Sequence, residues 1–461
     1  MDDEMTTLET RRLEVSRTLD REYRSTFGQF FTPAPIARFM ASLFSFPRSG
    51  TIHLLDPGAG IGSLTAAILE RNKTRNVAVS CYEIEPKFEH SLRKTLASYS
   101  RASFTVHQTD FIESAVKLVA GGKIPGFDAA ILNPPYRKIA IDSAHRLLTR
   151  KLGTEVSNLY TSFLVCTIAL CRPGAQVVAI IPRSFMNGVY FKPFRYWLLA
   201  HAAITRIHIF DSRDLAFADD NVLQENVIVR LVVGGKQGPV EISSSHDHSF
   251  ANLQTRICPF DEIVTSNDEE KFIHVPAPGN TNSYNLPGVT LRELGLDVCT
   301  GPVVDFRMSD YLRLHSERGT VPLLYATHFA NGQLEWPKES RKPNAIVRNS
   351  LTERWLMPNG CYVLTRRFTS KEEKRRVVAY VLNKGALPGK LVGFENHLNV
   401  IHKNKNGLQL NVALGLAKYL NSKMVDNYFR TFSGHTQVNA TDLRRLKYPS
   451  IKELAKLGSK K

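Results

Sequence analysis

The stretch Phe127-Asp128-Ala129-Ala130-Ile131-Leu132-Asn133-Pro134-Pro135-Tyr136 determines how the rest of the chain is interpreted. Its apolar first part has the length of a buried β-strand. Two consecutive prolines remove two backbone N–H donors and fix φ, so the strand must end there. The stiff turn leaves the Asn133 side-chain oxygen and the Pro134 carbonyl as acceptors beside the ring of Tyr136. Such a group suits a planar base with an exocyclic amine, although an ordinary Pro-Pro turn has the same sequence signature.

A glycine-rich turn lies upstream, between a predicted strand at residues 51–55 and a predicted helix at residues 63–69. It reads Asp56-Pro57-Gly58-Ala59-Gly60-Ile61-Gly62. Glycines let the backbone come close to a ligand, and a helix N-terminus favours a carboxylate or phosphate. The order of strand, turn and helix is typical of nucleotide-binding sheets. Because the G-x-G-x-x-G spacing of dinucleotide enzymes is absent, the turn alone does not exclude a plain strand-to-helix connection.

A second predicted strand, residues 76–82, ends directly before Glu83. A carboxylate in this position can accept hydrogen bonds from both hydroxyl groups of a ribose. The next residue, Ile84, is apolar and can cover one face of an adenine ring. Taken alone, Glu83 is better explained as a solvated carboxylate at the end of a strand.

A third predicted strand, residues 102–107, is followed by Asp110 and Phe111. Asp110 can accept a hydrogen bond from an adenine amino group while the Phe111 ring packs on the base. Four successive strands therefore end in residues suited to one ligand. Because ligands of open α/β sheets bind at the carboxyl ends of the strands, we expect all four strand ends to meet at one site.

The length and the charge of the chain bound its class. At 461 residues the chain is long enough for two or three domains with sizeable cores. Lys and Arg together exceed Asp and Glu by 17. A surplus of this size favours a polyanionic partner such as nucleic acid, although basic proteins need not bind one.

The cysteines and the apolar runs indicate a cytoplasmic protein. The six cysteines form no C-x-x-C pair, and several lie in apolar runs, so we expect reduced, buried thiols and no zinc site. The acidic start Met1-Asp2-Asp3-Glu4 is wrong for a signal peptide. The longest apolar run, residues 163–171, is too short to span a bilayer, so no membrane association is expected.

These motifs, together with Phe31-Thr32-Pro33, occur in a characteristic order. The set resembles the amino-DNA methyltransferases that use S-adenosylmethionine. The order, with the cofactor motifs before the catalytic Asn-Pro-Pro-Tyr and a recognition region last, resembles their gamma class, which includes the TaqI and PstI adenine-N6 modification enzymes. Of the individual pieces, Asn-Pro-Pro-Tyr is the most specific.

The resemblance implies an α/β fold. It consists of a Rossmann-like, seven-stranded methyltransferase sheet, mostly parallel with the last strand antiparallel, and a C-terminal mixed α+β DNA-recognition domain. Strands are predicted at residues 176–181, 205–210 and 227–233, and buried helices at residues 160–170 and 194–201. The expected divisions are an N-terminal helical extension (1–26), a catalytic domain that binds S-adenosylmethionine (27–240), a linker region (241–288) and a target-recognition domain (289–461).

The resemblance also implies roles for individual residues. Phe217 lies in a polar loop shortly before the last predicted strand, where the TaqI enzyme has an aromatic residue that stacks on the target base; a loop aromatic packed on the core is the alternative. The implied catalytic residues are Asn133, Pro134, Tyr136 and Phe217, of which Tyr136 and Phe217 are expected to stack on the flipped base. The implied cofactor-binding residues are Phe31, Thr32, Asp56, Gly58, Gly60, Glu83, Ile84, Asp110, Phe111 and Asn133.

The chain after residue 289 is basic and supplies the candidate DNA contacts. Between residues 366 and 376 six basic side chains outnumber two acidic ones, which suits a surface that contacts phosphates, although a solvated basic helix has the same composition. Gln and Asn can pair bidentately with adenine. The expected DNA-binding residues are Arg366, Arg367, Lys374, Arg375, Arg376, His435, Gln437 and Asn439.

The expected function is site-specific transfer of a methyl group from S-adenosylmethionine to N6 of a flipped adenine in duplex DNA. Such a reaction protects host DNA beside a separate restriction endonuclease, and the enzyme is expected to act as a monomer. Cytosine N4, adenine in RNA and a glutamine side chain also present a planar amine, so they remain alternative acceptors. A non-catalytic DNA-binding specificity protein is the alternative from another class.

Overall fold

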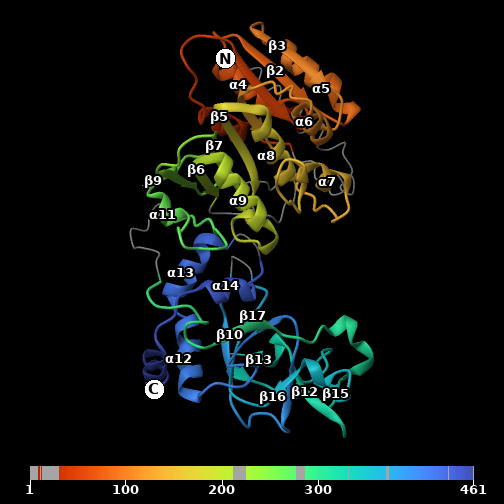
Figure 1. Cartoon of the computed structure of the whole chain (residues 1–461), viewed down its shortest axis with the longest axis vertical. Coiled ribbons are helices and arrows are strands. Elements are labelled where there is room, and N and C mark those ends of the chain that lie inside the picture. Colours follow the sequence, from red (N-terminus) through yellow and green to blue (C-terminus); the bar gives the residue numbers. More distant parts are fainter. Residues whose placement is uncertain are drawn as a thin grey trace. The chain divides into compact units, whose positions relative to one another are not determined.

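The computed structural model divides the chain into two compact units, Met1–Thr281 and Asn282–Lys461, which are described separately (Figure 1). The helix predicted for residues 1–26 falls almost entirely outside the described residues. These are 9–10, 12, 31–210, 225–276, 286–330, 332–369, 373–433 and 436–459.

The first unit is built on one mixed sheet of nine strands in the order β3-β2-β1-β4-β5-β7-β6-β8-β9. Strands β1 to β5 pair in parallel, and β7 runs antiparallel to both β5 and β6. The predicted Rossmann-like α/β fold and all seven predicted strands are confirmed. The strands are β1 (Ile52–Pro57), β2 (Val77–Tyr82), β3 (Ala102–His107), β4 (Phe127–Leu132), β5 (Cys171–Pro182), β6 (Ala202–Phe210), β7 (Asn226–Val233), β8 (Val240–Ser245) and β9 (Gln254–Cys258).

The linker predicted for residues 241–288 is wrong over most of its length. Strand β8 pairs in parallel with β6, and β9 pairs antiparallel with β8, so both strands extend the sheet. The short helix α11 (Phe260–Ile263) and the buried residues Ile273 and Val275 then pack on the same core. The serines and histidines of this stretch suggested a loop, but Val240, Ile242 and Cys258 are fully buried, and their packing outweighs that composition.

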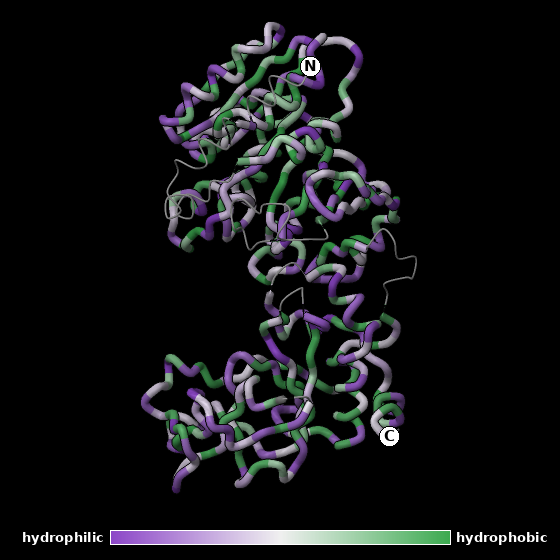
Figure 2. Tube along the Cα trace, turned by 180° about the vertical axis from the view of Figure 1, so that it is seen from behind, coloured by the Kyte–Doolittle hydropathy of each residue, from purple (hydrophilic) through white to green (hydrophobic). Residues whose placement is uncertain are grey.

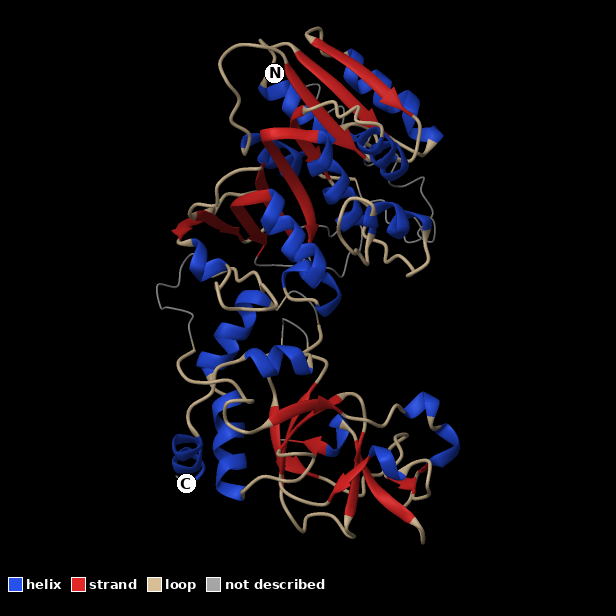
Figure 3. Ribbon diagram, in the orientation of Figure 1, coloured by secondary structure: helices blue, strands red, loops and turns tan. Residues whose placement is uncertain are grey.

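Helices cover both faces of the sheet, as expected for parallel strands joined by crossover helices (Figure 3). The two faces carry separate hydrophobic cores, in which side chains of these helices are buried. One face packs against α3 (Ala34–Ser42), α4 (Ser63–Arg71) and α5 (Pro86–Ala97). The other packs against α6 (Phe111–Ala120), α7 (Ala144–Arg150), α8 (Leu159–Leu170) and α9 (Lys192–His201).

Helix α8 is apolar on all sides, and almost every one of its residues is buried, as predicted for residues 160–170. A helix of this composition belongs inside a core, because it has no polar face to offer to water. The hydropathy colouring shows the corresponding hydrophobic runs inside each unit (Figure 2). Among the described residues, no helix is long and apolar enough to span a bilayer.

The described residues of the second unit form small sheets and four α-helices, in agreement with the predicted mixed α+β composition. One sheet has the order β10-β20-β17-β18, another β11-β15-β12-β19-β16, and β13 pairs with β14. The strands are β10 (Asp297–Thr300), β11 (Leu312–Arg313), β12 (Thr320–Leu324), β13 (Phe329–Ala330), β14 (Gln333–Leu334), β15 (Ala345–Val347), β16 (Leu356–Pro358), β17 (Tyr362–Arg366), β18 (Ala379–Leu382), β19 (Leu391–Phe394) and β20 (Leu398–His402). The helices are α12 (Leu410–Leu420), α13 (Lys423–Phe432), α14 (Ala440–Arg445) and α15 (Ile451–Ser459).

Helices α12 and α15 approach each other through glycine. A Cβ at Gly415 would lie 1.8 Å from the carbonyl oxygen of Leu454, and a Cβ at Gly458 would lie 1.8 Å from the carbonyl oxygen of Asn411. Neither distance is possible for real atoms. The two backbones can therefore touch only because both positions lack a side chain.

We expect Gly415→Ala to lower the free energy of unfolding of the second unit by about 1–3 kcal/mol, because the helices must separate to admit the methyl group. Helix propensity alone favours alanine by about 1 kcal/mol, so a net loss isolates the contact. Denaturant unfolding measures the effect. Lys423→Ala, at an exposed position of α13 in the same unit, is the control. Equal stability of the two variants would contradict the close approach.

Candidate active site

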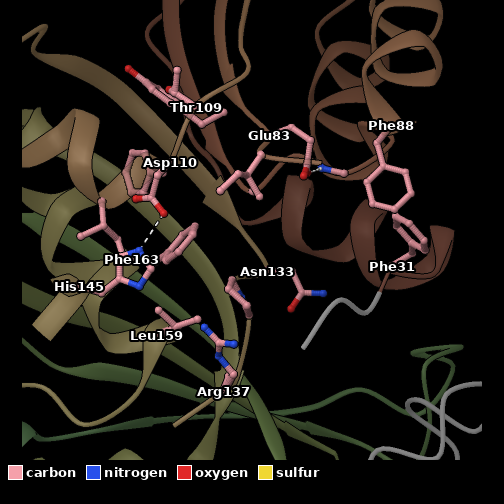
Figure 4. Close-up of a pocket in the computed structure, with 17 residues that line it drawn as sticks. Phe31, Glu83, Phe88, Thr109, Asp110, Asn133, Arg137, His145, Leu159 and Phe163 are labelled. Atoms are coloured by element: carbon pink, nitrogen blue, oxygen red, sulfur yellow. Dashed lines mark hydrogen bonds and ion pairs between the residues drawn. The ribbon is translucent and has the colours of Figure 1, made fainter. Parts of the chain in front are cut away.

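A cavity of about 220 Å³ opens at the carboxyl ends of the central strands of the first unit (Figure 4). Its walls come from the loops that follow β1, β2, β3 and β4, the strand ends at which the sequence predicted a site. Eight of the ten predicted cofactor residues line it. They are Phe31, Gly58, Gly60, Glu83, Ile84, Asp110, Phe111 and Asn133.

The glycine turn and Glu83 form one wall of the cavity. The Gly60 N–H donates to Oε2 of Glu83 at 2.7 Å, and the Glu85 N–H donates to Oε1 at 2.8 Å. Gly60 has φ +56°, and a Cβ there would lie 3.1 Å from the Phe31 ring, so only glycine leaves this wall open. Burial raises the pKa of Glu83, against the lowering effect of these backbone donors. Each carboxylate oxygen keeps acceptor capacity for a ligand.

Apolar side chains supply the neighbouring surface. Ile84 is 58% exposed, which is unusual for isoleucine, and it borders the cavity. Phe111 is buried with its ring centroid 5.2 Å from that of Phe163. Phe163 comes from α8 and contacts the glycine turn as well, since a Cβ at Gly58 would meet it at 3.4 Å. The cavity thus offers apolar contacts to a flat ring close to the carboxylate of Glu83.

Asp110 caps helix α6 and also faces the cavity. Its Oδ1 accepts from the Glu113 N–H at 2.9 Å, and its Oδ2 lies 2.8 Å from Nε2 of His145. Burial would raise the pKa of Asp110, but the hydrogen bonds from His145 and from the α6 backbone outweigh burial and lower it. The carboxylate is therefore ionised and available as an acceptor at neutral pH.

The Asn-Pro-Pro-Tyr turn places an amide at the edge of the cavity. The Tyr136 hydroxyl donates to Oδ1 of Asn133 at 2.7 Å, and Nδ2 of Asn133 donates to Oγ1 of Thr32 at 3.0 Å. Two independent bonds fix which end of the amide is the acceptor. The amide oxygen retains a second lone pair for a ligand.

The predicted stacking role of Tyr136 does not agree with this structure. The side chain is only 5% exposed, and its ring packs edge-on against Tyr160 at 6.3 Å, inside the core. Burial raises the pKa of the Tyr136 hydroxyl, which therefore stays protonated and acts as a donor. Tyr136 therefore orients the Asn133 amide through its hydroxyl, and its buried ring has no face exposed for stacking on a base.

Asp56 and Thr32 do not line the cavity, contrary to the prediction that both contact the cofactor. The Asp56 carboxyl is fully buried and accepts from Oγ1 of Thr65 at 2.5 Å, which ties the end of β1 to helix α4. Thr32 is 3% exposed and reaches the site only through Asn133. Both residues support groups that line the cavity.

Some of the side chains predicted to contact DNA in the second unit are exposed, and others already interact with residues of the same unit. Lys374 and Arg375 are exposed. Arg376 is 1% exposed and stacks on Phe429, so the prediction that it contacts phosphate is wrong in this structure. Arg366 pairs with Glu373 at 2.9 Å.

The remaining predicted DNA contacts lie on loops and at a helix start. Arg367 lies over Phe368 and donates to the Asn396 carbonyl. Asn439 caps α14, which occupies its side-chain oxygen. Gln437 is half-buried. Phe217 and His435 lie outside the described residues.

Sequence reasoning missed several residues that line the cavity. Arg137 and His145 follow the Asn-Pro-Pro-Tyr turn, while Phe88, Leu159 and Phe163 come from helices. Their positions depend on how those segments fold back over the strand ends. The one available signal was proximity in the chain, since Arg137 directly follows Tyr136.

The fold and the site define a Rossmann-like methyltransferase: the strand order places a carboxylate after β2, an aspartate after β3 and Asn-Pro-Pro-Tyr after β4 around one cavity. The chain is 49% identical to the type II methyltransferase M.BsuBI of Bacillus subtilis, over 98% of this chain and 93% of that protein. It is 40% identical to the type II methyltransferase M.PstI of Providencia stuartii, over 96% and 91%. The chain belongs to this type II methyltransferase family, and the predicted resemblance to the PstI enzyme is confirmed.

One family model and two solved structures also match this chain. Residues 55–217 match the family model of the Eco57I restriction-modification methylase. A chain of the DrdV–DNA complex aligns with a TM-score of 0.51 at 12% identity, over 98% of this chain and 59% of that one. The type ISP restriction-modification enzyme LlaBIII bound to DNA gives 0.51 at 10%, over 98% and 40%. At these identities the likeness concerns the fold alone.

The buried carboxyl of Asp56 leads to a pH prediction. Burial raises its pKa from the ordinary 3.8 to about 7, helped by the charge of Glu83 and opposed by Thr65. Between these values the folded state keeps a proton that the unfolded state releases, so the free energy of unfolding falls as pH rises through this window. The loss reaches up to about 4 kcal/mol.

Asp56→Asn is expected to remove this part of the pH dependence, because the amide keeps the acceptor for Thr65 and carries no charge. Urea unfolding between about pH 4 and pH 7.5 measures it. Asp261→Asn, a change at an exposed carboxylate, serves as the control. If Asp56→Asn retained the wild-type slope, the buried carboxyl would not be its source.

Proposed function

We propose that this protein transfers a methyl group from S-adenosylmethionine to N6 of an adenine in duplex DNA, as the modification enzyme of a restriction-modification system. One observation carries the proposal. A neutral amide oxygen, that of Asn133, is fixed by Tyr136 at the edge of a cavity whose walls include Glu83 and Asp110.

The donor set of the cavity fits S-adenosylmethionine. Glu83 is a buried carboxylate suited to the two ribose hydroxyls, and Asp110 is an ionised acceptor suited to the purine amino group. The exposed Ile84 and the ring of Phe163 provide apolar surface for the purine. The open wall at Gly60 supports the same assignment, because a side chain there would collide with Phe31.

The main difficulty of the reaction is that N6 of adenine is a weak nucleophile, because its lone pair is delocalised into the ring. The residues around Asn133 can counteract this delocalisation. When bound, S-adenosylmethionine supplies a methyl group on a sulfonium, whose departure as a neutral thioether needs no acid. The Asn133 oxygen and the Pro134 carbonyl accept hydrogen bonds from the two N6–H groups of adenine. One of these protons leaves to solvent once N6 carries the methyl group. This arrangement draws the lone pair out of the ring and aligns it for attack. Because Asn133 is held on both sides of its amide, it needs no reorganisation during the reaction.

The target base must leave the duplex before it reaches Asn133, at a cost of a few kcal/mol. Since Tyr136 is buried, stacking has to come from another aromatic residue. The resemblance to the TaqI enzyme supports Phe217 for this role, worth about 1–3 kcal/mol. The flanking duplex contacts the basic second unit, where Lys374 and Arg375 are exposed. A separate restriction endonuclease acts on the same recognition sequence.

Asn133→Ala is expected to abolish methyl transfer, because N6 of adenine loses the side-chain acceptor, while binding of S-adenosylhomocysteine persists.

The substrate is tested by incubating duplex DNA and the enzyme with radiolabelled S-adenosylmethionine and then digesting the DNA to nucleosides. The expected product is N6-methyladenine; N4-methylcytosine, or transfer only to RNA or protein, would refute the proposed substrate.

The matched control is Asn72→Ala, which removes an amide that bonds to the Ile68 carbonyl at the end of α4. Asn72 does not line the cavity, so this variant is expected to keep wild-type turnover. If Asn133→Ala also turned over like wild type, the catalytic assignment would be wrong.

Replacement of Lys374 and Arg375 by alanine is expected to weaken DNA binding and to lower the slope of log K against log salt by about 1–2, because up to two phosphate contacts are lost. Fluorescence anisotropy over a range of salt concentrations measures the slope. The control is Lys452→Ala with Lys456→Ala, which removes the same charge from exposed positions of α15. Identical slopes for the two double variants would remove Lys374 and Arg375 from the DNA interface.

A further inference from the structure

His145 holds the second oxygen of Asp110 (Figure 4). It is the second residue of α7, whose start is fixed by Ser143, which accepts from the Arg146 N–H at 3.3 Å. The next turn is tied down as well, since Nε of Arg146 donates to Glu155 at 3.0 Å. The position of the imidazole is therefore set by a short anchored helix and not by a mobile loop.

The Asp110–His145 contact exceeds what a helix cap needs. A capping carboxylate requires one oxygen, and Oδ1 of Asp110 fulfils this role by accepting from Glu113. The bond from His145 to Oδ2 fixes the plane of the carboxylate as well. Both side chains line the same cavity and are partly exposed, at 21% for Asp110 and 25% for His145, so the pair faces the space of the ligand.

We propose that His145 is a cofactor-positioning residue: by binding Oδ2 of Asp110, it orients the carboxylate so that a remaining lone pair accepts from the amino group of the purine. This inference rests on the proposed function. It predicts that loss of His145 weakens recognition of the amino group specifically and leaves the contacts to the ribose and the apolar walls intact.

The charges around His145 give the interaction a pH dependence. The hydrogen bond to Asp110 raises the pKa of His145, the charge of Glu113 adds to this, and Arg137 and burial oppose it. Below its pKa the imidazolium makes a charge-assisted bond, which is stronger than the bond from the neutral ring. Affinity for the cofactor is therefore expected to fall as pH rises through the pKa of His145.

The test compares two ligands by isothermal titration calorimetry on the full chain: S-adenosylhomocysteine and its analogue with unsubstituted purine in place of adenine. His145→Phe is expected to bind S-adenosylhomocysteine about tenfold more weakly than wild type does, with little change for the analogue. His145→Gln keeps a donor, so it is expected to retain most of the affinity and to lose its pH dependence. Arg150→Gln, on the same helix and outside the cavity, is the control.

The possible results test the positioning role of His145 separately from the proposed function. Equal loss for both ligands in His145→Phe, or no loss for either, would overturn the inference while the proposed function stood. If His145→Phe does not fold, His145→Gln decides, because an unchanged pH dependence in this variant would equally overturn the role of His145. If wild type binds neither ligand, the proposed function itself fails.

Discussion

Helices bury both faces of the central strands, and this burial determines where polar side chains can lie in the first unit. Strands β1 and β4 pair in parallel, and both of their faces are covered by helices, so polar side chains can emerge only where the strands end. Leu54, Leu55 and Ile131 are fully buried inside the sheet, whereas Asn133 reaches the cavity. The ends of β2, β3 and β4 therefore bring Glu83, Asp110 and Asn133 to one cavity. The glycine turn after β1 keeps its wall open.

The same constraint sets the electrostatics of the site. Asp56 and Glu83 lie at the ends of neighbouring strands, and burial raises the pKa of both. Their environments nevertheless differ. Asp56 accepts from the hydroxyl of Thr65, whereas Glu83 accepts from the backbone N–H groups of Gly60 and Glu85 and lines the cavity. The Asp56 carboxyl thus ties the end of β1 to α4, whereas the Glu83 carboxyl lines the cavity.

The sequence was sufficient to predict the residues at the strand ends but not the groups that fold back over them. Alternating apolar runs and proline or glycine turns located all seven expected strands, because these signals are local. The linker prediction failed at β8 and β9, where burial of Val240 and Cys258 outweighs a polar composition. Similarly, Arg376 looked like a phosphate contact by charge, yet Phe429 and Thr369 hold it inside the second unit.

Tyr136 shows why a motif can be recognised correctly while one of its roles is assigned wrongly. An aromatic residue after Asn-Pro-Pro suggests a stacking surface, but proline fixes the backbone so that the ring enters the core beside Tyr160. Burial raises the pKa of its hydroxyl, which therefore stays protonated and donates to the Asn133 oxygen. A buried donor thus defines the orientation of the Asn133 amide without adding a charge beside it.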